Sequence, residues 1–108
     1  MVEQSILCPI KKLIDVLTKR NIRTNKVILY GSYAEGKNTK YSDIDIAIIS
    51  DDFGKDRTEE KMLLFRLGSC IDPRLEAIPL TLKAFQEDTW VPLIYEIKTK
   101  GIELAITG

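Results

Sequence analysis

The chain of 108 residues carries 16 basic and 16 acidic side chains, so its formal net charge is zero. This length predicts one domain over residues 1–108 with a single core, in which any pocket is shallow or completed by another chain. The zero net charge argues against bulk nucleic-acid binding through neutralisation of many phosphates. Because no apolar run approaches the roughly 20 residues of a membrane span and no secretory signal is evident, we expect a soluble, cytoplasmic protein.

Two residue types that often carry chemistry are scarce or missing. The chain has two cysteines, Cys8 and Cys70, in segments expected to be helical and without a CxxC spacing, and it has no histidine. The usual soft and imidazole ligands of zinc are therefore lacking, as is the side chain most often used for general acid–base catalysis. This composition excludes zinc sites and histidine-based catalysis.

The N-terminal part of the chain predicts a helix followed by a strand. Apolar side chains recur at three-and-four spacing between residues 10 and 17, which is typical of one helix face, and Pro9 suits a first helical turn. We expect this helix to pack on a sheet. After a polar break over residues 21–25, residues 26–30 form the short, almost continuous apolar run that is typical of a buried strand.

A glycine and a serine follow this strand. Gly31 frees the backbone to bend sharply and Ser32 can cap the amides that follow, so residues 32–36 predict a single helical turn. A polar loop over residues 37–42 then leads to a second strand, residues 44–49. Because side chains alternate along a strand, we expect one face of it to be core and the other to begin with a pair of carboxylates.

The second half of the chain predicts two helices and two further strands. An acidic, glycine-containing turn precedes a helix that starts near Thr58 and stops at Asp72-Pro73. We expect a third strand at residues 75–80, a loop or short turn at 83–88, a last helix at 91–100 and a short terminal strand at 102–106. The helix residues expected to face inward are Met62, Leu63, Phe65 and Leu67, with Cys70 as a further candidate, and then Leu93, Ile94 and Ile97. This order of elements predicts an α/β (α+β) domain with a small mixed or antiparallel sheet flanked by helices.

The carboxylate pair at the start of the second strand, Asp43 and Asp45, suits a divalent cation. Mg²⁺ prefers oxygen ligands, usually one or two carboxylates with phosphate oxygens and water, and two residues on one strand face can hold one ion or bridge two. Backbone amides after Gly31 and the Ser32 hydroxyl supply groups that attract phosphate. Each feature alone is common, as an ordinary turn or as solvated strand-end aspartates, but their spacing together predicts a metal-dependent nucleotidyl-transfer site.

The spacing of these residues resembles a known signature. The run Gly31-Ser32, ten residues, then Asp43-Ile44-Asp45 is similar to that of the DNA polymerase β nucleotidyltransferase superfamily, and the short length resembles its minimal nucleotidyltransferase (MNT) branch. Three further residues fit that branch's common Gly-Ser-x-Ala-x-Gly and Ser-Asp-x-Asp pattern: Ala34, Gly36 and Ser42. The resemblance implies a polymerase β-type nucleotidyltransferase fold, in which Gly31 and Ser32 hold a triphosphate and the two aspartates bind Mg²⁺.

The family also has a third carboxylate on a later strand, which helps to bind metal and can deprotonate the attacking hydroxyl. Glu76 is the candidate, because it is acidic in an otherwise apolar strand and its neighbours Leu75 and Ala77 would face the other way. Many members have aspartate there, so a glutamate alters the expected metal geometry. The alternatives are that Glu76 is simply solvated, or that Asp72 takes the role, although the following Pro73 places Asp72 more naturally at a helix stop.

The resemblance implies an enzyme that moves a nucleoside monophosphate, AMP from ATP or the equivalent from another NTP, onto an acceptor hydroxyl. Minimal members resemble antitoxins that adenylylate a tyrosine of a separate helical HEPN protein, so we expect such a partner and leave a homo-oligomer open. One alternative is an inactive or barely active antitoxin that acts by complex formation, which the three retained carboxylates disfavour. Another is transfer to a small molecule such as an aminoglycoside, which the lack of an acceptor lobe disfavours.

Overall fold

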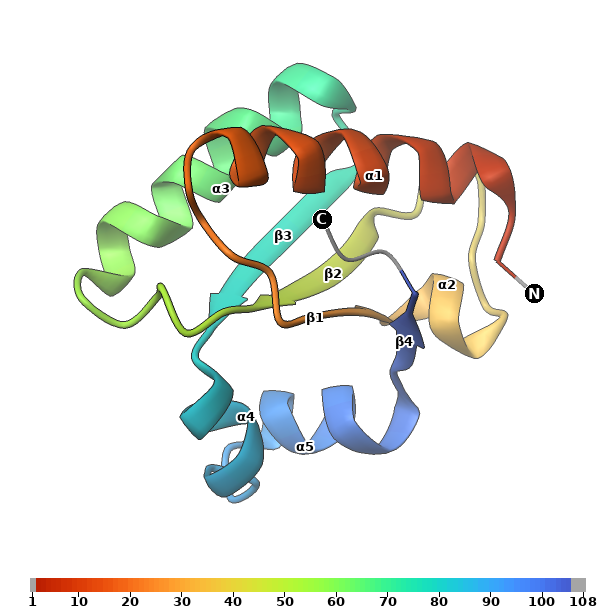
Figure 1. Cartoon of the computed structure of the whole chain (residues 1–108). Coiled ribbons are helices and arrows are strands. Elements are labelled where there is room, and N and C mark those ends of the chain that lie inside the picture. The colour runs from red at the N-terminus through yellow and green to blue at the C-terminus, as the bar shows by residue number, and fades with distance from the viewer. Residues whose placement is uncertain (1, 106–108) are drawn as a thin grey trace.

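The computed structural model describes residues 2–105, which form a four-stranded sheet with helices on both of its faces (Figure 1). In chain order the elements are α1 (Gln4–Lys19), β1 (Lys26–Tyr30), α2 (Ser32–Glu35), β2 (Ile44–Ile49), α3 (Arg57–Ile71), β3 (Leu75–Leu80), α4 (Leu82–Glu87), α5 (Pro92–Lys100) and β4 (Ile102–Leu104). The strand order is β3-β2-β1-β4. β1 pairs antiparallel with β2 and β4, whereas β2 and β3 are parallel, so the predicted mixed sheet flanked by helices is confirmed.

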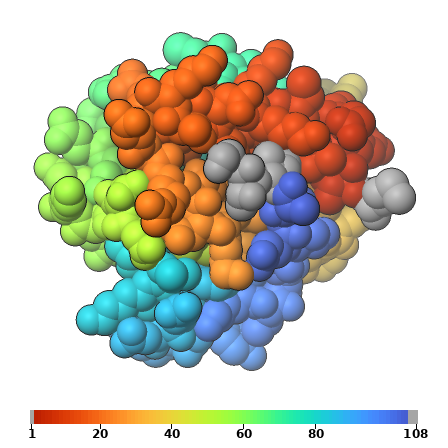
Figure 2. Space-filling view, in the orientation of Figure 1, coloured from red at the N-terminus to blue at the C-terminus, as the bar shows by residue number. Residues whose placement is uncertain are grey.

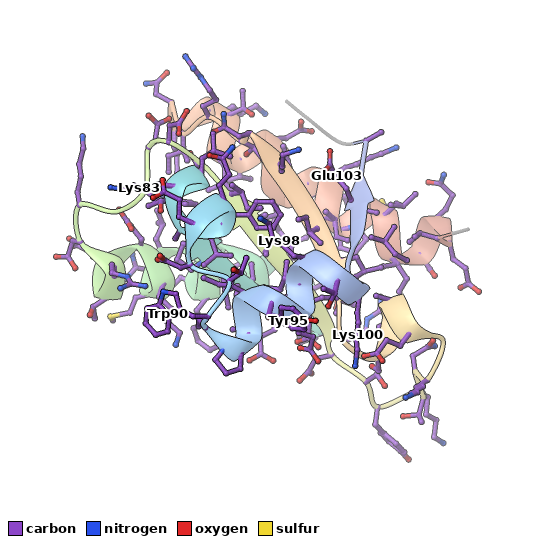
Figure 3. All side chains as sticks on the ribbon, turned by 90° about the horizontal axis from the view of Figure 1, so that it is seen from below. Lys83, Trp90, Tyr95, Lys98, Lys100 and Glu103 are labelled. Carbon is purple, nitrogen blue, oxygen red and sulfur yellow. The ribbon has the colours of Figure 1, made fainter. Side chains whose placement is uncertain are left out.

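Both faces of β2 are buried under helices. Ile44, Ile46 and Ile48 pack with residues of α1 and α3, while Ala47 and Ile49 pack on the opposite face with residues of α4 and α5. Figure 2 shows α1 over the upper part of the molecule and α4 with α5 over the lower part, and Figure 3 shows the lower layer from below. As predicted, one face of this strand is core and the other begins with a carboxylate, and the structure adds that Ala47 and Ile49 on this second face are also buried. The second face is polar only where β2 begins.

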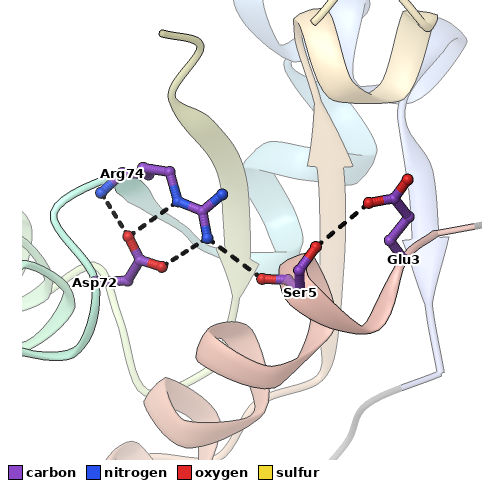
Figure 4. A network of polar contacts seen from close by, with 4 residues as sticks. All are labelled: Glu3, Ser5, Asp72 and Arg74. Carbon is purple, nitrogen blue, oxygen red and sulfur yellow. Dashed lines mark hydrogen bonds and ion pairs between the residues drawn. The ribbon is translucent and has the colours of Figure 1, made fainter. Parts of the chain in front are cut away.

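Pro9 lies inside α1, which begins five residues earlier than predicted. A proline has no N–H to donate to the carbonyl four residues before it, here that of Ser5. The Arg74 guanidinium donates to this oxygen instead, with Nη2 at 3.3 Å, and Asp72 fixes the guanidinium through hydrogen bonds of 2.9 and 3.2 Å (Figure 4). The helix continues through Pro9 because a side chain 69 residues away replaces the missing donor.

The buried stripe of α3 is narrower than predicted. The helix begins at Arg57, one residue before the predicted start, and follows Asp56, whose carboxylate accepts a hydrogen bond from the Glu59 amide at 3.1 Å. It packs on the edge strand β3 and on one side of α1, so that its fully buried residues are Leu64 and Gly68. Of the residues predicted to face inward, Leu63 and Leu67 are half-buried, whereas the others are exposed: Met62 (53%), Phe65 (67%) and Cys70.

A short helix, α4, occupies most of the segment that the sequence predicts as a loop or turn. Thr81 caps its first turn, since the hydroxyl oxygen accepts a hydrogen bond from the Ala84 amide at 3.0 Å. Phe85 points into the second core and anchors the helix there. The polar composition of this segment favours a loop, whereas Thr81 as a cap and Phe85 as a core residue are the sequence features that indicate a helix.

The last helix and strand follow the predictions with two differences. α5 buries Ile94 and Ile97 as expected, whereas Leu93 is 41% exposed. β4 ends at Leu104, so the predicted strand is too long at Ala105, and its last predicted residue, Ile106, falls outside the described residues. Within residues 2–105, no helix combines the length and the apolar character that crossing a membrane requires.

Candidate functional site

The pairing of the strands brings the predicted acidic residues together. Asp45 on β2 is directly opposite Tyr30 on β1 and Glu76 on β3. Partners in register point to the same face of a sheet, so these three side chains share the face that α5 covers. Asp45 is half-buried, whereas Asp43 and Glu76 are exposed. The neighbours of Glu76 are buried on the other face, as predicted from the sequence.

The electrostatics of the site confirm that its carboxylates are close neighbours. Burial raises the pKa of Asp45 to about 6, with further increases from the negative charges of Glu76, Asp43 and Glu96. Burial, followed by the charges of Asp45, Glu76 and Glu96, raises the pKa of the Tyr30 phenol above its ordinary range, so this side chain stays neutral. No ion pair between described residues involves Asp43, Asp45 or Glu76. The site therefore holds negative charge that no nearby cationic side chain balances.

Glu96 is a fourth acidic residue of this site, and the sequence reasoning did not find it. It lies on α5 between the buried residues Ile94 and Ile97 and is itself half-buried. Its charge acts on both Asp45 and Tyr30. The signal that was available is an acidic residue inside the inward-facing stretch of a helix, where a solvated glutamate is unusual.

The turn after β1 lies directly against Asp45. Gly31, and not Ser32, is the N-cap of α2, and no side-chain cap bond is made, so the predicted capping by Ser32 is wrong. The Gly31 oxygen accepts hydrogen bonds from the amides of Ala34 and Glu35, each at 3.1 Å, which starts α2. Gly31 has a φ of +72°, and a Cβ at this position would overlap the Asp45 carboxylate. The absence of a side chain is what allows the turn and the carboxylate to adjoin.

The alternative third carboxylate, Asp72, is occupied elsewhere. It accepts hydrogen bonds from the Arg74 side chain and from the Arg74 amide at 2.9 Å, and these bonds hold the pKa of Asp72 below its ordinary value despite partial burial. This pair supports α1 through the Ser5 carbonyl, on the other side of the sheet from the acidic site. Glu76 therefore remains the candidate for the third carboxylate.

The donor set fits a hard divalent cation such as Mg²⁺. Asp45 and Glu76 lie opposite each other on adjacent strands, the charge of Asp43 acts on Asp45, and phosphate oxygens and water complete such sites. As the side chains stand, no group of three or more aspartate, glutamate, cysteine or histidine residues within 2–105 is arranged to hold a metal ion. Metal binding by these three residues therefore stays a prediction. Asp43 and Glu76 are exposed, so these carboxylates can be reached from solvent.

Comparison with known families identifies this arrangement. Residues 10–100 match the model of a family described as the nucleotidyltransferase domain. The chain belongs to the nucleotidyltransferase domain family. The matched range contains the turn at Gly31 and all four carboxylates of the site, which confirms the family that the sequence motif resembles.

Two curated relatives come from Methanocaldococcus jannaschii. The one named "Putative protein adenylyltransferase MJ1547" is 41% identical over 58 residues, which cover 53% of this chain and 44% of the relative. The one named "Putative protein adenylyltransferase MJ0604" is 49% identical over 43 residues, which cover 39% of this chain and 43% of the relative. The matched segments thus span less than half the length of either relative.

Two solved structures share the fold. The crystal structure of a "putative nucleotidyltransferase" from Sulfolobus solfataricus aligns with a TM-score of 0.66 at 16% identity, over 92% of this chain and 78% of that one. A chain from a crystal structure of a toxin-antitoxin with AMP-PNP aligns with a TM-score of 0.59 at 26% identity, over 86% of this chain and 70% of that one. The first likeness, at its low identity, bears on the fold alone.

Proposed function

We propose that this nucleotidyltransferase domain transfers AMP from ATP to a protein hydroxyl in the cytoplasm and releases pyrophosphate. Gly31 and Ser32 bind the triphosphate, and Asp43, Asp45 and Glu76 bind Mg²⁺, which when bound neutralises phosphate charge and stabilises the charge of the transition state. The Glu76 carboxylate takes the proton of the acceptor hydroxyl as its oxygen bonds to the α-phosphorus. The bond from that phosphorus to the bridging oxygen of pyrophosphate breaks in the same displacement.

The placement of Asp45 between Glu76 and the Gly31 turn is the observation that carries this proposal. It sets a carboxylate pair beside a turn that a side chain would block. The unbalanced negative charge around Asp45 favours a bound cation. A phosphate-binding turn, a cation site and a candidate base are thus within one small area of the sheet.

The acceptor that we propose is a tyrosine on a helical HEPN-type partner, in an antitoxin role. The similarity to a chain from a toxin-antitoxin structure with AMP-PNP supports both a nucleotide and a partner chain. The names of the two relatives support a protein acceptor. The open site is in accord with this proposal, since the exposed carboxylates of Asp43 and Glu76 leave room for a side chain of another protein to approach.

A second candidate function is neutralisation of such a partner by binding alone. The observation that favours it is that the carboxylates, as they stand, are not gathered into a metal-binding group within the described residues. In that case the toxin-antitoxin likeness would reflect assembly without transfer.

Transfer from ATP labelled at the α-phosphate separates the two functions. The protein is incubated with Mg²⁺ and with a helical partner encoded beside it, and label on either protein is measured after denaturing electrophoresis. We expect label on the partner with wild type and none with the double variant Asp43→Asn, Asp45→Asn, which keeps the fold. An unlabelled partner that still binds tightly would support neutralisation by binding and refute the enzyme.

A further inference from the structure

Glu35, the last residue of α2, gathers two lysines beside the Gly31 turn. The Lys37 Nζ lies 3.8 Å and the Lys100 Nζ lies 4.0 Å from the same Glu35 oxygen, Oε1. The lysine side chains are 76% and 59% exposed, whereas that of Glu35 is 25% exposed. Long, exposed ion pairs of this kind contribute little to stability, so the two ammonium groups are held near α2 only weakly.

α5 carries Lys100 to this position. Ile94 and Ile97 anchor the helix on the second core, and Glu96 lies one turn before Lys100 on the same side of the helix. That side faces the acidic site, because the charge of Glu96 acts on Asp45. Figure 3 shows Lys100 at the end of α5 next to α2.

Two other basic side chains, Arg74 and Lys98, are already engaged elsewhere. Arg74 is fixed by Asp72 and by the Ser5 carbonyl on the far side of the sheet. Lys98, also on α5, lies toward α4, with its Nζ 5.1 Å from the centre of the Phe85 ring and donating to the Gln86 oxygen at 3.4 Å.

We propose that Lys100, together with Lys37, binds the β- and γ-phosphates of the nucleotide, and that Glu35 holds both lysines beside the turn until the nucleotide arrives. This inference rests on the proposed function, because it assumes a triphosphate at Gly31 and Ser32. The terminal phosphates carry most of the negative charge of an NTP, and the surrounding acidic residues repel it. Lysine is a point charge on a flexible stem, suited to exchanging a weak glutamate pair for a phosphate.

Three variants test the proposal through equilibrium binding of ATP with Mg²⁺, measured by calorimetry. Lys100→Gln should weaken ATP binding about tenfold, while leaving AMP binding within about twofold, because AMP lacks the β- and γ-phosphates. Lys98→Gln is the matched control from the same helix and should change neither. Glu35→Gln should strengthen ATP binding a few-fold, since it removes the competitor of the phosphates. In steady-state transfer, Lys100→Gln should raise KM for ATP with little change in kcat.

The outcomes separate this proposal from the proposed function. If Lys100→Gln binds ATP as Lys98→Gln does, or loses AMP and ATP binding equally, the phosphate role of Lys100 is refuted, while transfer by wild type would still support the enzyme. If wild type transfers no AMP but binds inorganic tripolyphosphate through Lys100, the phosphate site stands and the enzyme is refuted. If wild type binds neither ATP nor tripolyphosphate, both are refuted. Circular dichroism of each variant checks that the fold is kept.

Discussion

Replacing Asp45 with asparagine should make the protein more stable at pH 7.5 while removing its activity. Burial and the charges of Glu76, Asp43 and Glu96 raise the Asp45 pKa from 3.8 to about 6. At about 1.4 kcal/mol per pKa unit, the full effect would destabilise the ionised, metal-free protein by about 3 kcal/mol. Because Asp45 is half-buried and its neighbours are largely exposed, solvent screening reduces the expected gain for Asp45→Asn to about 1 kcal/mol, or about 5 °C in melting temperature.

The direction of this pKa shift determines how the free energy of unfolding should change with pH. A carboxyl group whose pKa is higher in the folded state binds more protons there, so its stabilising contribution is present at low pH and is lost as the pH rises through about 6. Wild type and Asp45→Asn should therefore have similar free energies of unfolding below about pH 3.8, diverge as the pH rises from there to about 6, and keep a constant difference above that pH. Asp15→Asn, a change at an exposed helix position, is the control and should show no such divergence.

Urea unfolding followed by circular dichroism measures this difference, since Trp90 is 79% exposed and its fluorescence would report unfolding poorly. Saturating Mg²⁺ should stabilise wild type more than Asp45→Asn and so narrow the gap, because a ligand that binds only the folded state adds to its stability. If Asp45→Asn is no more stable than wild type at pH 7.5, or if the gap does not shrink toward pH 4.5, the idea of unbalanced charge at this site is wrong.

Three further predictions concern the Gly31 turn, the contact of Arg74 with α1, and Glu76. Gly31→Ala should abolish ATP binding and destabilise the fold by about 2–3 kcal/mol. Gly36 has a similar φ of +71° but open space where a Cβ would lie, so Gly36→Ala should cost about 1 kcal/mol and keep ATP binding. Equal effects of the two changes in thermal melts and calorimetry would contradict this. Arg74→Met should lower the free energy of unfolding in urea by about 2 kcal/mol, because it leaves the Ser5 carbonyl without a donor. The loss should be smaller in a Pro9→Ala background, where the amide of the new residue can donate to that carbonyl. If the two changes are simply additive, Arg74 does not replace the donor that Pro9 lacks. Glu76→Gln should lower kcat for transfer about a hundredfold or more with the fold unchanged, and a normal kcat would exclude Glu76 as the base.

The strands were the part of the fold that the sequence predicted best. β1, β2 and β3 have the bounds expected from short apolar runs, because glycine, aspartate and proline interrupt those runs at their ends. The start of α1 was missed for a tertiary reason, since Arg74 supplies the hydrogen bond that Pro9 cannot. The exposed residues of α3 were missed because a sequence pattern does not show that the helix packs on an edge strand, where only a narrow stripe is covered.

The acidic site shows the same division between local and tertiary information. The closeness of Asp43 and Asp45 follows from their separation by one residue, although Asp43 lies just before β2, and Gly31 is set by the turn that must follow β1. The neighbourhood of Glu76 depends on β3 lying parallel to β2 with Asp45 opposite Glu76, a register that no local pattern specifies. The presence of Glu96 in the site depends in addition on how α5 packs on the second core.

Under the proposed function, the residues of the acidic site account for the transfer but not for the choice of acceptor. Under the proposed function, the residues that bind the metal and the triphosphate come from the sheet, from α2 and from α5. Asp43 and Glu76 are exposed, so an acceptor can approach these carboxylates from solvent. An acceptor that is itself a protein can supply its own positioning contacts, which a small molecule cannot do. Under the proposed function we therefore expect a macromolecular acceptor and not a small one, with specificity at the surface where the partner meets this domain.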